Sequence, residues 1–246
     1  MHYYKWNDTV VDLNPEGYFI NDGQTGMGLL NNKLFTYEIN EIHKVIREYA
    51  DPKKDFIDIG AHIGTYSFLT APHFNHVHSF EPNKEIYNYL CGNIALRNQS
   101  DKVDTYNLGL SNKEDELTYY KRSHDGGGNG FEDIKSTEAT ENMGKLKVKT
   151  LDSYNFNNIG FIKIDVEGHE RNVLLGAKKT LKANNYPPIL FESWTPGEHA
   201  DHDVDYVTKL RNELFDTIKG FGYTITSFNG CSEIFLASKQ MTRLIH

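Results

Sequence analysis

The sequence is poor in cysteine. Its 246 residues include only two, Cys91 and Cys231, and neither has a second metal-ligating residue at the spacing of a zinc motif. Small secreted domains that depend on disulfides carry more cysteine than this. We therefore expect two free thiols in a reducing compartment, and we predict a cytoplasmic location.

Basic residues and long apolar runs are also scarce. Lysine and arginine total 26 against 34 acidic residues, which gives a net charge of −8. An acidic surface repels phosphate backbones, so we expect no nucleic-acid partner. No run reaches the roughly 18 apolar residues of a membrane span, and residues 1–6 lack the apolar segment of a secretory signal, so we expect no membrane partner. The sequence carries no signal of the oligomeric state.

Short apolar runs alternate with segments of helical periodicity along most of the chain. This alternation is typical of an α/β fold in which helices cover both faces of a mostly parallel sheet. Two further strand-like runs flank the turn dipeptide Asn229-Gly230, which favours a C-terminal antiparallel hairpin. The expected strands are residues 56–59, 76–80, 103–108, 161–164, 189–191, 223–228 and 232–237, and the expected helices are residues 66–72, 84–98, 170–183 and 204–221.

Two segments lie outside this alternating pattern. Residues 1–50 predict an N-terminal segment of loops and short strands, followed by a helix over 36–50 that packs on a core domain of residues 51–246. Residues 122–145 contain five glycines among polar residues and predict a long flexible insertion between two strands. Long loops in compact domains are often lids or binding loops, and a surface loop without a role is an equal alternative.

A glycine-rich turn follows the first expected strand. Its spacing, Gly60-x-x-x-Gly64, differs from the Gly-x-Gly-x-x-Gly pattern that seats a pyrophosphate, so a phosphate-free nucleoside fits better. Glu81 follows the second strand, where a carboxylate can accept hydrogen bonds from both ribose hydroxyls. The turn and Glu81, in this order, predict a nucleoside-binding site.

Three blocks of sequence resemble the FkbM family of S-adenosylmethionine-dependent O-methyltransferases. They are FIDIGAHIGTYS at 56–67, FEPN at 80–83 and IKIDVEGHE at 162–170, and the similarity spans roughly residues 37–192. The resemblance implies the class I methyltransferase fold, a Rossmann-like seven-stranded sheet that ends in an antiparallel pair. It also implies S-adenosylmethionine as cofactor and O-methylation of a small acceptor, a sugar or glycan. One departure is His62, which stands where the family usually has asparagine.

The resemblance also assigns a set of cofactor-binding residues. It implies that the glycine turn lines the methionine end of the cofactor, that Glu81 holds the ribose, and that the residues near Asn107 to Ser111, after the third strand, border the adenine. The expected cofactor-binding residues are Asp58, Gly60, Ala61, His62, Gly64, Glu81, Pro82, Ser111 and Asp165.

Polar residues after the fourth and fifth strands predict the catalytic side of the site. Ligands bind outside the carboxyl ends of parallel strands, which here deliver Asp165, His169 and Glu192. A sugar hydroxyl needs a base or a metal to remove its proton, so His169 or Asp165 is a candidate base. Asp165 and Glu192 are also candidate ligands of a divalent metal such as magnesium, as in some related sugar methyltransferases. The alternative for His169 is a capping or packing role.

Two other classes of function compete with methyl transfer. An NAD-dependent Rossmann-type dehydrogenase would share the fold, and the missing pyrophosphate fingerprint counts against it. A non-catalytic nucleoside-binding protein would keep the turn and Glu81 without turnover.

Overall fold

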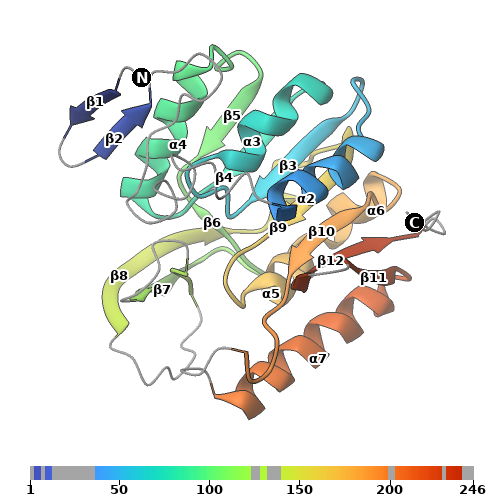
Figure 1. The fold of residues 1–246 in the computed structure, drawn as a ribbon. Helices are drawn as coiled ribbons and strands as arrows, with labels where there is room; N and C mark the ends of the chain where they lie inside the picture. Colours follow the sequence, from blue (N-terminus) through green and yellow to red (C-terminus); the bar gives the residue numbers. More distant parts are fainter. Residues whose placement is uncertain are drawn as a thin grey trace.

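The fold is that of a computed structural model, shown in Figure 1. The structure describes residues 3–6, 9–12, 37–122, 128–131, 140–198, 203–228 and 231–239.

The centre of the molecule is a seven-stranded sheet with the order β11-β12-β10-β9-β3-β4-β5. Neighbouring strands are parallel except where β12 pairs with β10 and β11, so β12 alone runs against the other six. This confirms the fold class that the sequence predicts. The strands are β3 (Asp55–Ile59), β4 (Val77–Phe80), β5 (Val103–Tyr106), β9 (Ile159–Ile164), β10 (Ile189–Glu192), β11 (Thr224–Phe228) and β12 (Cys231–Ser238).

Helices cover both faces of this sheet (Figure 1). The central strands are buried on both sides, so their alternate side chains enter two separate hydrophobic clusters. Phe56 and Phe161 pack with α2 (Tyr37–Glu48), α3 (Thr65–Thr70) and α4 (Lys84–Leu96). Their sequence neighbours Ile57 and Ile162 pack on the other face with α5 (Glu170–Leu175), α6 (Lys178–Ala183) and α7 (Val204–Gly220). Two short 3-10 helices, η1 (Ala71–His73) and η2 (Leu151–Tyr154), complete the layers.

The helix expected over residues 170–183 is in fact two helices, so that expectation was wrong in one respect. The chain breaks at Gly176, where a Cβ atom would lie only 2.0 Å from the main-chain oxygen of Ser111. The segment carrying Ser111 is packed directly against the helix there. A contact between residues this far apart in sequence is invisible to helical periodicity.

Two small sheets lie beside the main one (Figure 1). One is the antiparallel pair β1 (Tyr3–Trp6) and β2 (Thr9–Asp12), and the other contains β6 (Gly109–Leu110), β7 (Asp115–Arg122) and β8 (Thr140–Lys149). Strands β7 and β8 extend into the expected insertion and shorten it from both ends, and Gly130 pairs with Tyr120. Gly126, Gly127 and the Asn229-Gly230 turn lie outside the described residues.

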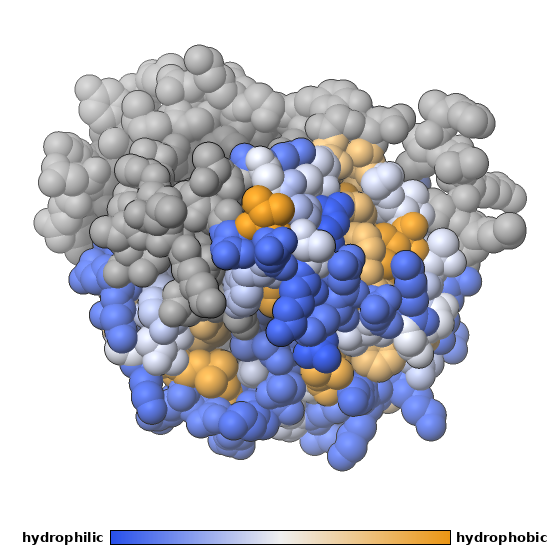
Figure 2. Space-filling model, turned by 90° about the horizontal axis from the view of Figure 1, so that it is seen from below, coloured by the Kyte–Doolittle hydropathy of each residue, from blue (hydrophilic) through white to orange (hydrophobic). Residues whose placement is uncertain are grey.

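The described surface is mostly hydrophilic. Figure 2 shows small, separate hydrophobic areas on one face, and the large apolar side chains that are exposed among the described residues are Leu96, Met143 and Val204. Both cysteines are free thiols, as expected. Within the described residues, no helix combines the length and apolar character that crossing a bilayer requires. Helix α2 packs against α3, and the expected domain boundary near residue 50 stays a prediction.

Candidate active site

Five parallel strands end at one edge of the main sheet, and polar groups gather there. Strands β3, β4, β5 and β9 are followed by Gly60, Glu81, Asn107 and Asp165, and β10 ends in Glu192. The register of the parallel pairs places these ends side by side, with Ile59 opposite both Phe80 and Ile164. The edge therefore has the position that ligand sites occupy in open α/β sheets.

The glycine turn requires its glycines for two reasons. Gly60 and Gly64 have φ values of +75° and +91°, in the left-handed region that glycine tolerates best. A Cβ at Gly60 would lie 1.7 Å from the main-chain oxygen of Asp165, so the turn after β3 is pressed against the loop after β9. The main-chain N–H groups of Gly60 and Ala61 both donate to the Phe80 oxygen, which ties the turn to β4 as well.

Glu81 contacts the glycine turn directly. Its Oε2 accepts a hydrogen bond of 3.1 Å from the main-chain N–H of His62, and its Oε1 accepts one of 2.8 Å from Asn83. Burial raises the pKa of Glu81, and nearby His62 opposes this effect. The two places that a nucleoside would have to contact at once are therefore adjacent. The capping role at α4 belongs to Asn83, whose side chain accepts from the N–H groups of Glu85 and Ile86.

Two residues expected near the adenine lie in different surroundings. Asn107 donates hydrogen bonds of 3.0 Å to the main-chain oxygens of Glu81 and Pro82, so it supports the ribose side. Ser111 is buried, and its hydroxyl lies 2.9 Å from Nε2 of His169. Asn107 therefore contacts the main chain of Glu81 and Pro82, whereas Ser111 contacts the ring of His169.

Asp58 lies beneath the turn. Its carboxylate is fully buried and accepts a hydrogen bond of 2.6 Å from Ser67, which in turn accepts one of 2.8 Å from Ser79. Burial raises the pKa of Asp58, and Lys163 opposes the rise. These contacts brace β3 against α3 and β4. Direct contact of Asp58 with the cofactor stays a prediction.

Lys163 is the residue of the site that the sequence analysis missed. Its buried Nζ donates a hydrogen bond of 2.8 Å to the Gly60 oxygen and lies 3.1 Å from Asp165 Oδ2 and 3.6 Å from Asp58 Oδ1. Burial alone would lower the pKa of Lys163, but Asp165 and Asp58 together raise it, so the side chain is a cation. The available signal was a lone lysine inside an apolar strand, because lysine is almost never fully buried unless it is paired.

Three carboxylates gather beside this lysine. Ligand atoms of Asp165, Glu167 and Glu192 all lie within 4.8 Å of one another. Oε2 of Glu192 is buried and has no hydrogen-bond partner among the described residues. Burial, and then the charge of Asp165, raises the pKa of Glu192 well above its ordinary value. The structure therefore brings Asp165 and Glu192 together as expected, and it adds Glu167.

Glu170 holds the loop that carries these carboxylates. Its Oε1 accepts hydrogen bonds of 3.0 Å from the N–H of Val166 and 3.2 Å from the N–H of Gly168. The loop needs this support because Glu167 and Gly168 have positive φ values of 58° and 94°. Burial raises the pKa of Glu170 to about 7.

His169 has both ring nitrogens within hydrogen-bond distance of polar side chains. Nε2 lies 2.9 Å from the Ser111 hydroxyl, and Nδ1 lies 3.2 Å from the Asn172 amide. The residue is buried, and its ring lies 5.6 Å from that of Phe131. These contacts favour the packing role, and the role of His169 as a base stays a prediction.

A small pocket adjoins the carboxylate loop on the α7 side. Its lining includes Gly168, Glu170, Trp194, Leu210 and Arg211. Trp194 is buried and packs with Val207, and Arg211 donates a hydrogen bond of 3.0 Å to the Trp194 oxygen. Helix α7 thus holds Trp194, just after β10, at the edge of the site.

Comparison with known families and proteins agrees with this arrangement. A family model described as the methyltransferase FkbM domain matches residues 58–223, which include both the glycine turn and the carboxylates. Among curated proteins, the chain is 26% identical over 183 residues to the hexuronic acid methyltransferase AglP of Haloferax volcanii. That match covers 70% of this chain and 67% of AglP.

Two of the solved structures that match the chain are the following. A Staphylococcus aureus protein described as a caffeoyl-CoA O-methyltransferase has a TM-score of 0.51 at 14% identity, with 88% of this chain and 92% of that one covered. The methyltransferase FkbM of Methylobacillus flagellatus has a TM-score of 0.48 at 14% identity. The match covers 89% of this chain and only 56% of that one.

Proposed function

The chain belongs to the FkbM family of S-adenosylmethionine-dependent methyltransferases, and we propose that it methylates a hydroxyl oxygen of a sugar or glycan. The observation that carries this proposal is the direct contact between the glycine turn and Glu81, at the same sheet edge as Asp165 and Glu192. Similarity to a hexuronic acid methyltransferase supports a sugar-like acceptor. Because the chain belongs to a methyltransferase family, the alternative of an NAD-dependent dehydrogenase no longer applies.

The cofactor would extend along this edge from β4 to β9. Glu81 has acceptor capacity left on both carboxylate oxygens, which suits the two ribose hydroxyls. Gly60, Ala61, His62 and Gly64 would lie against the methionine portion, and the two glycines allow the main chain of the turn to pack closely against Asp165 and Leu90. The Asp165 carboxylate would lie near the positively charged sulfonium and stabilise it.

Asp165 would act as the general base. Its side chain is 32% exposed, so an acceptor can reach it, while Lys163 holds Oδ2 at 3.1 Å. The acceptor hydroxyl gives its proton to the Asp165 carboxylate as its oxygen bonds to the cofactor's methyl carbon. The methyl–sulfur bond breaks, and the electron pair stays on sulfur to give neutral S-adenosylhomocysteine. Aligning the two reactants is the larger part of the task.

A divalent metal such as magnesium fits the same carboxylates. Asp165, Glu167 and Glu192 offer the oxygen ligands that hard cations prefer, and the buried Glu192 Oε2 has no hydrogen-bond partner among the described residues. Asp165 and Glu192, with Glu167 added by the structure, would hold the metal. A metal bound there would lower the pKa of an acceptor hydroxyl. Asp165 would be the general base if the reaction needs no metal, and a metal ligand if it does.

The test is a methyl-transfer assay on a panel of hexoses, hexuronic acids and nucleotide sugars. S-adenosylhomocysteine formation is measured with and without a chelator, and the products are checked for a new methyl ether. We expect turnover on at least one hydroxylated acceptor. Binding of S-adenosylhomocysteine without turnover on any acceptor class would favour the non-catalytic alternative, and methylation at nitrogen or carbon would contradict the proposal. Loss of turnover with the chelator, restored by magnesium, would assign Asp165 to the metal.

A further inference from the structure

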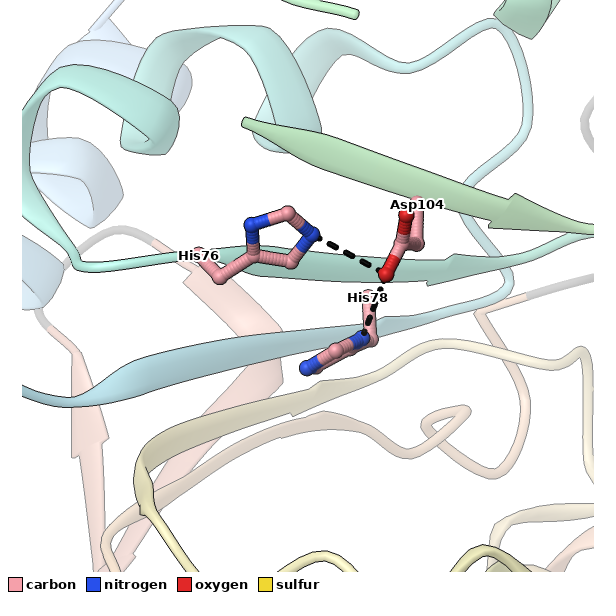
Figure 3. A group of neighbouring side chains, drawn as sticks. All are labelled: His76, His78 and Asp104. Carbon is pink, nitrogen blue, oxygen red and sulfur yellow. Dashed lines mark ion pairs between the residues drawn. The ribbon is translucent and has the colours of Figure 1, made fainter. Parts of the chain in front are cut away.

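Two histidines and an aspartate meet at the edge of the main sheet where the parallel strands begin, opposite the candidate active site. His76 immediately precedes β4, His78 lies near the beginning of β4, and Asp104 lies near the beginning of β5. Figure 3 shows both imidazole rings turned toward the Asp104 carboxylate. The proposed catalytic residues follow the carboxyl ends of the strands, so this cluster is separate from the site described above.

The local sequence brings these three side chains to one face. Side chains alternate along a strand, so His76 and His78 point to the same side of β4. The parallel register pairs His78 with Asp104 on the neighbouring strand. Because β5 is the last strand of the sheet, Asp104 lies at the border of the sheet and is exposed to water, whereas His78 is buried.

The distances in the cluster match those of a metal site. Nε2 of His76 lies 3.0 Å from Oδ2 of Asp104, Nδ1 of His78 lies 3.7 Å from the same oxygen, and one ligand atom from each residue lies within 4.8 Å of the others. Two ligands of a tetrahedral zinc ion, with bonds of about 2.0–2.2 Å, lie about 3.3–3.6 Å apart. Small side-chain adjustments would therefore complete the geometry.

We propose that His76, His78 and Asp104 form a binding site for a divalent transition metal, Zn²⁺ in the first instance. Two imidazole nitrogens and one carboxylate oxygen are ligands that suit zinc and not magnesium. The side chains of His76 and Asp104 are 26% and 56% exposed, which leaves a path for the ion and room for water as the fourth ligand.

The surroundings of His78 support this assignment. Its other nitrogen, Nε2, lies 3.8 Å from Oδ2 of Asp55, and Oδ1 of Asp55 accepts a hydrogen bond of 2.8 Å from Asn75. Metal-ligating histidines are commonly oriented by a carboxylate on the second ring nitrogen. The ring is also held against Phe156, at a centroid distance of 4.3 Å.

A metal here would join β4 to the edge strand β5. These are the strands whose other ends carry Glu81 and Asn107, so the ion would stabilise the part of the sheet that supports the proposed ribose grip. Its role is structural, and the inference does not depend on the proposed function.

The test is Co²⁺ titration of the full chain, followed by visible absorption, with Zn²⁺ competition and Zn²⁺-dependent thermal unfolding as further measurements. We expect a histidine-ligated site that binds Co²⁺ and Zn²⁺ in competition, and a higher melting temperature with Zn²⁺. His76→Ala, at a half-buried position, and Asp104→Asn, at an exposed one, should each weaken binding at least about tenfold. His78→Gln is the third ligand variant, and its folding is checked by circular dichroism because the residue is buried.

Two controls make the result specific. His73→Ala removes a histidine outside the cluster and should leave binding unchanged. Asp165→Asn removes a carboxylate of the other edge and should also leave the Co²⁺ spectrum unchanged. No Co²⁺ or Zn²⁺ binding, or binding that survives both His76→Ala and Asp104→Asn, would overturn the proposal and leave an ion pair between His76 and Asp104. Loss of the signal in Asp165→Asn alone would assign the metal to the carboxylates.

Discussion

The ammonium group of Lys163 lies between the main-chain oxygen of Gly60, at 2.8 Å, and the carboxylate of Asp165, at 3.1 Å. One buried cation thus joins the proposed cofactor turn to the proposed base. It also neutralises Asp58, whose carboxylate is 3.6 Å away and fully buried. Lys163 is therefore a positioning residue that acts through Gly60 and Asp165.

Replacing this cation should destabilise the fold. We expect Lys163→Met to lose roughly 3–5 kcal/mol in the free energy of unfolding, because it leaves Asp58 buried without its partner. Urea unfolding measures the loss, and Lys209→Met, at an exposed position of α7, is the matched control. Adding Asp58→Asn to Lys163→Met should recover part of the stability. If the double variant is no more stable than Lys163→Met, the charge argument is wrong.

Removing the proposed base should separate chemistry from binding. Asp165→Asn keeps the shape of the side chain and should lower kcat by about 10²–10⁴-fold, the range of general base catalysis. Affinity for S-adenosylhomocysteine, measured by calorimetry, should change little because that product lacks the sulfonium charge. The control is Asp101→Asn, at an exposed position before β5. An unchanged kcat in Asp165→Asn would remove this residue from the mechanism.

Weakening the proposed contact between Glu81 and the ribose should lower the affinity for the cofactor and leave kcat largely unchanged. Glu81→Gln removes the charge that accepts from the ribose hydroxyls, and a hydrogen bond to a charged group contributes about 1.5–3 kcal/mol. We expect affinity for S-adenosylmethionine to fall about ten- to a hundredfold by calorimetry, while kcat at saturating cofactor falls much less. Glu85→Gln, on the exposed face of α4, should behave as wild type. Equal affinity in Glu81→Gln and wild type would contradict the assignment.

The sequence predicted the sheet, its hairpin and the edge where the polar residues meet. The periodicity of each element, and the order of the elements along the chain, can be read from short stretches of sequence. It also paired the glycine turn with Glu81, since both follow neighbouring parallel strands. It did not reveal the role of Lys163 or the break at Gly176. Both depend on contacts with residues far away in the chain, the Gly60 and Ser111 oxygens, which only the folded structure brings near. The contact of His169 with Ser111 was hidden for the same reason.

Glu170 should make stability depend on pH near neutrality. Its pKa in the folded protein is about 7, above the ordinary 4.5, because burial disfavours the charged form. The folded state therefore holds the Glu170 proton more tightly than the unfolded state does. The resulting stabilisation is fully present below about pH 4.5 and is lost as the pH rises to about 7. The loss amounts to roughly 3 kcal/mol, to which the raised pKa values of Glu81, Asp58 and Glu192 add in the same direction.

Glu170→Gln removes this titration and should keep one acceptor for the N–H groups of Val166 and Gly168. Urea unfolding at pH 5, 6, 7 and 8 should show a smaller decline of stability with pH in Glu170→Gln than in wild type. The variant should also be the more stable protein at pH 8, where wild-type Glu170 is a buried carboxylate. Glu116→Gln, at an exposed position of β7, controls for the loss of a surface charge. If wild type and Glu170→Gln decline in parallel, Glu170 does not titrate between pH 5 and 8, and the argument from its raised pKa is wrong.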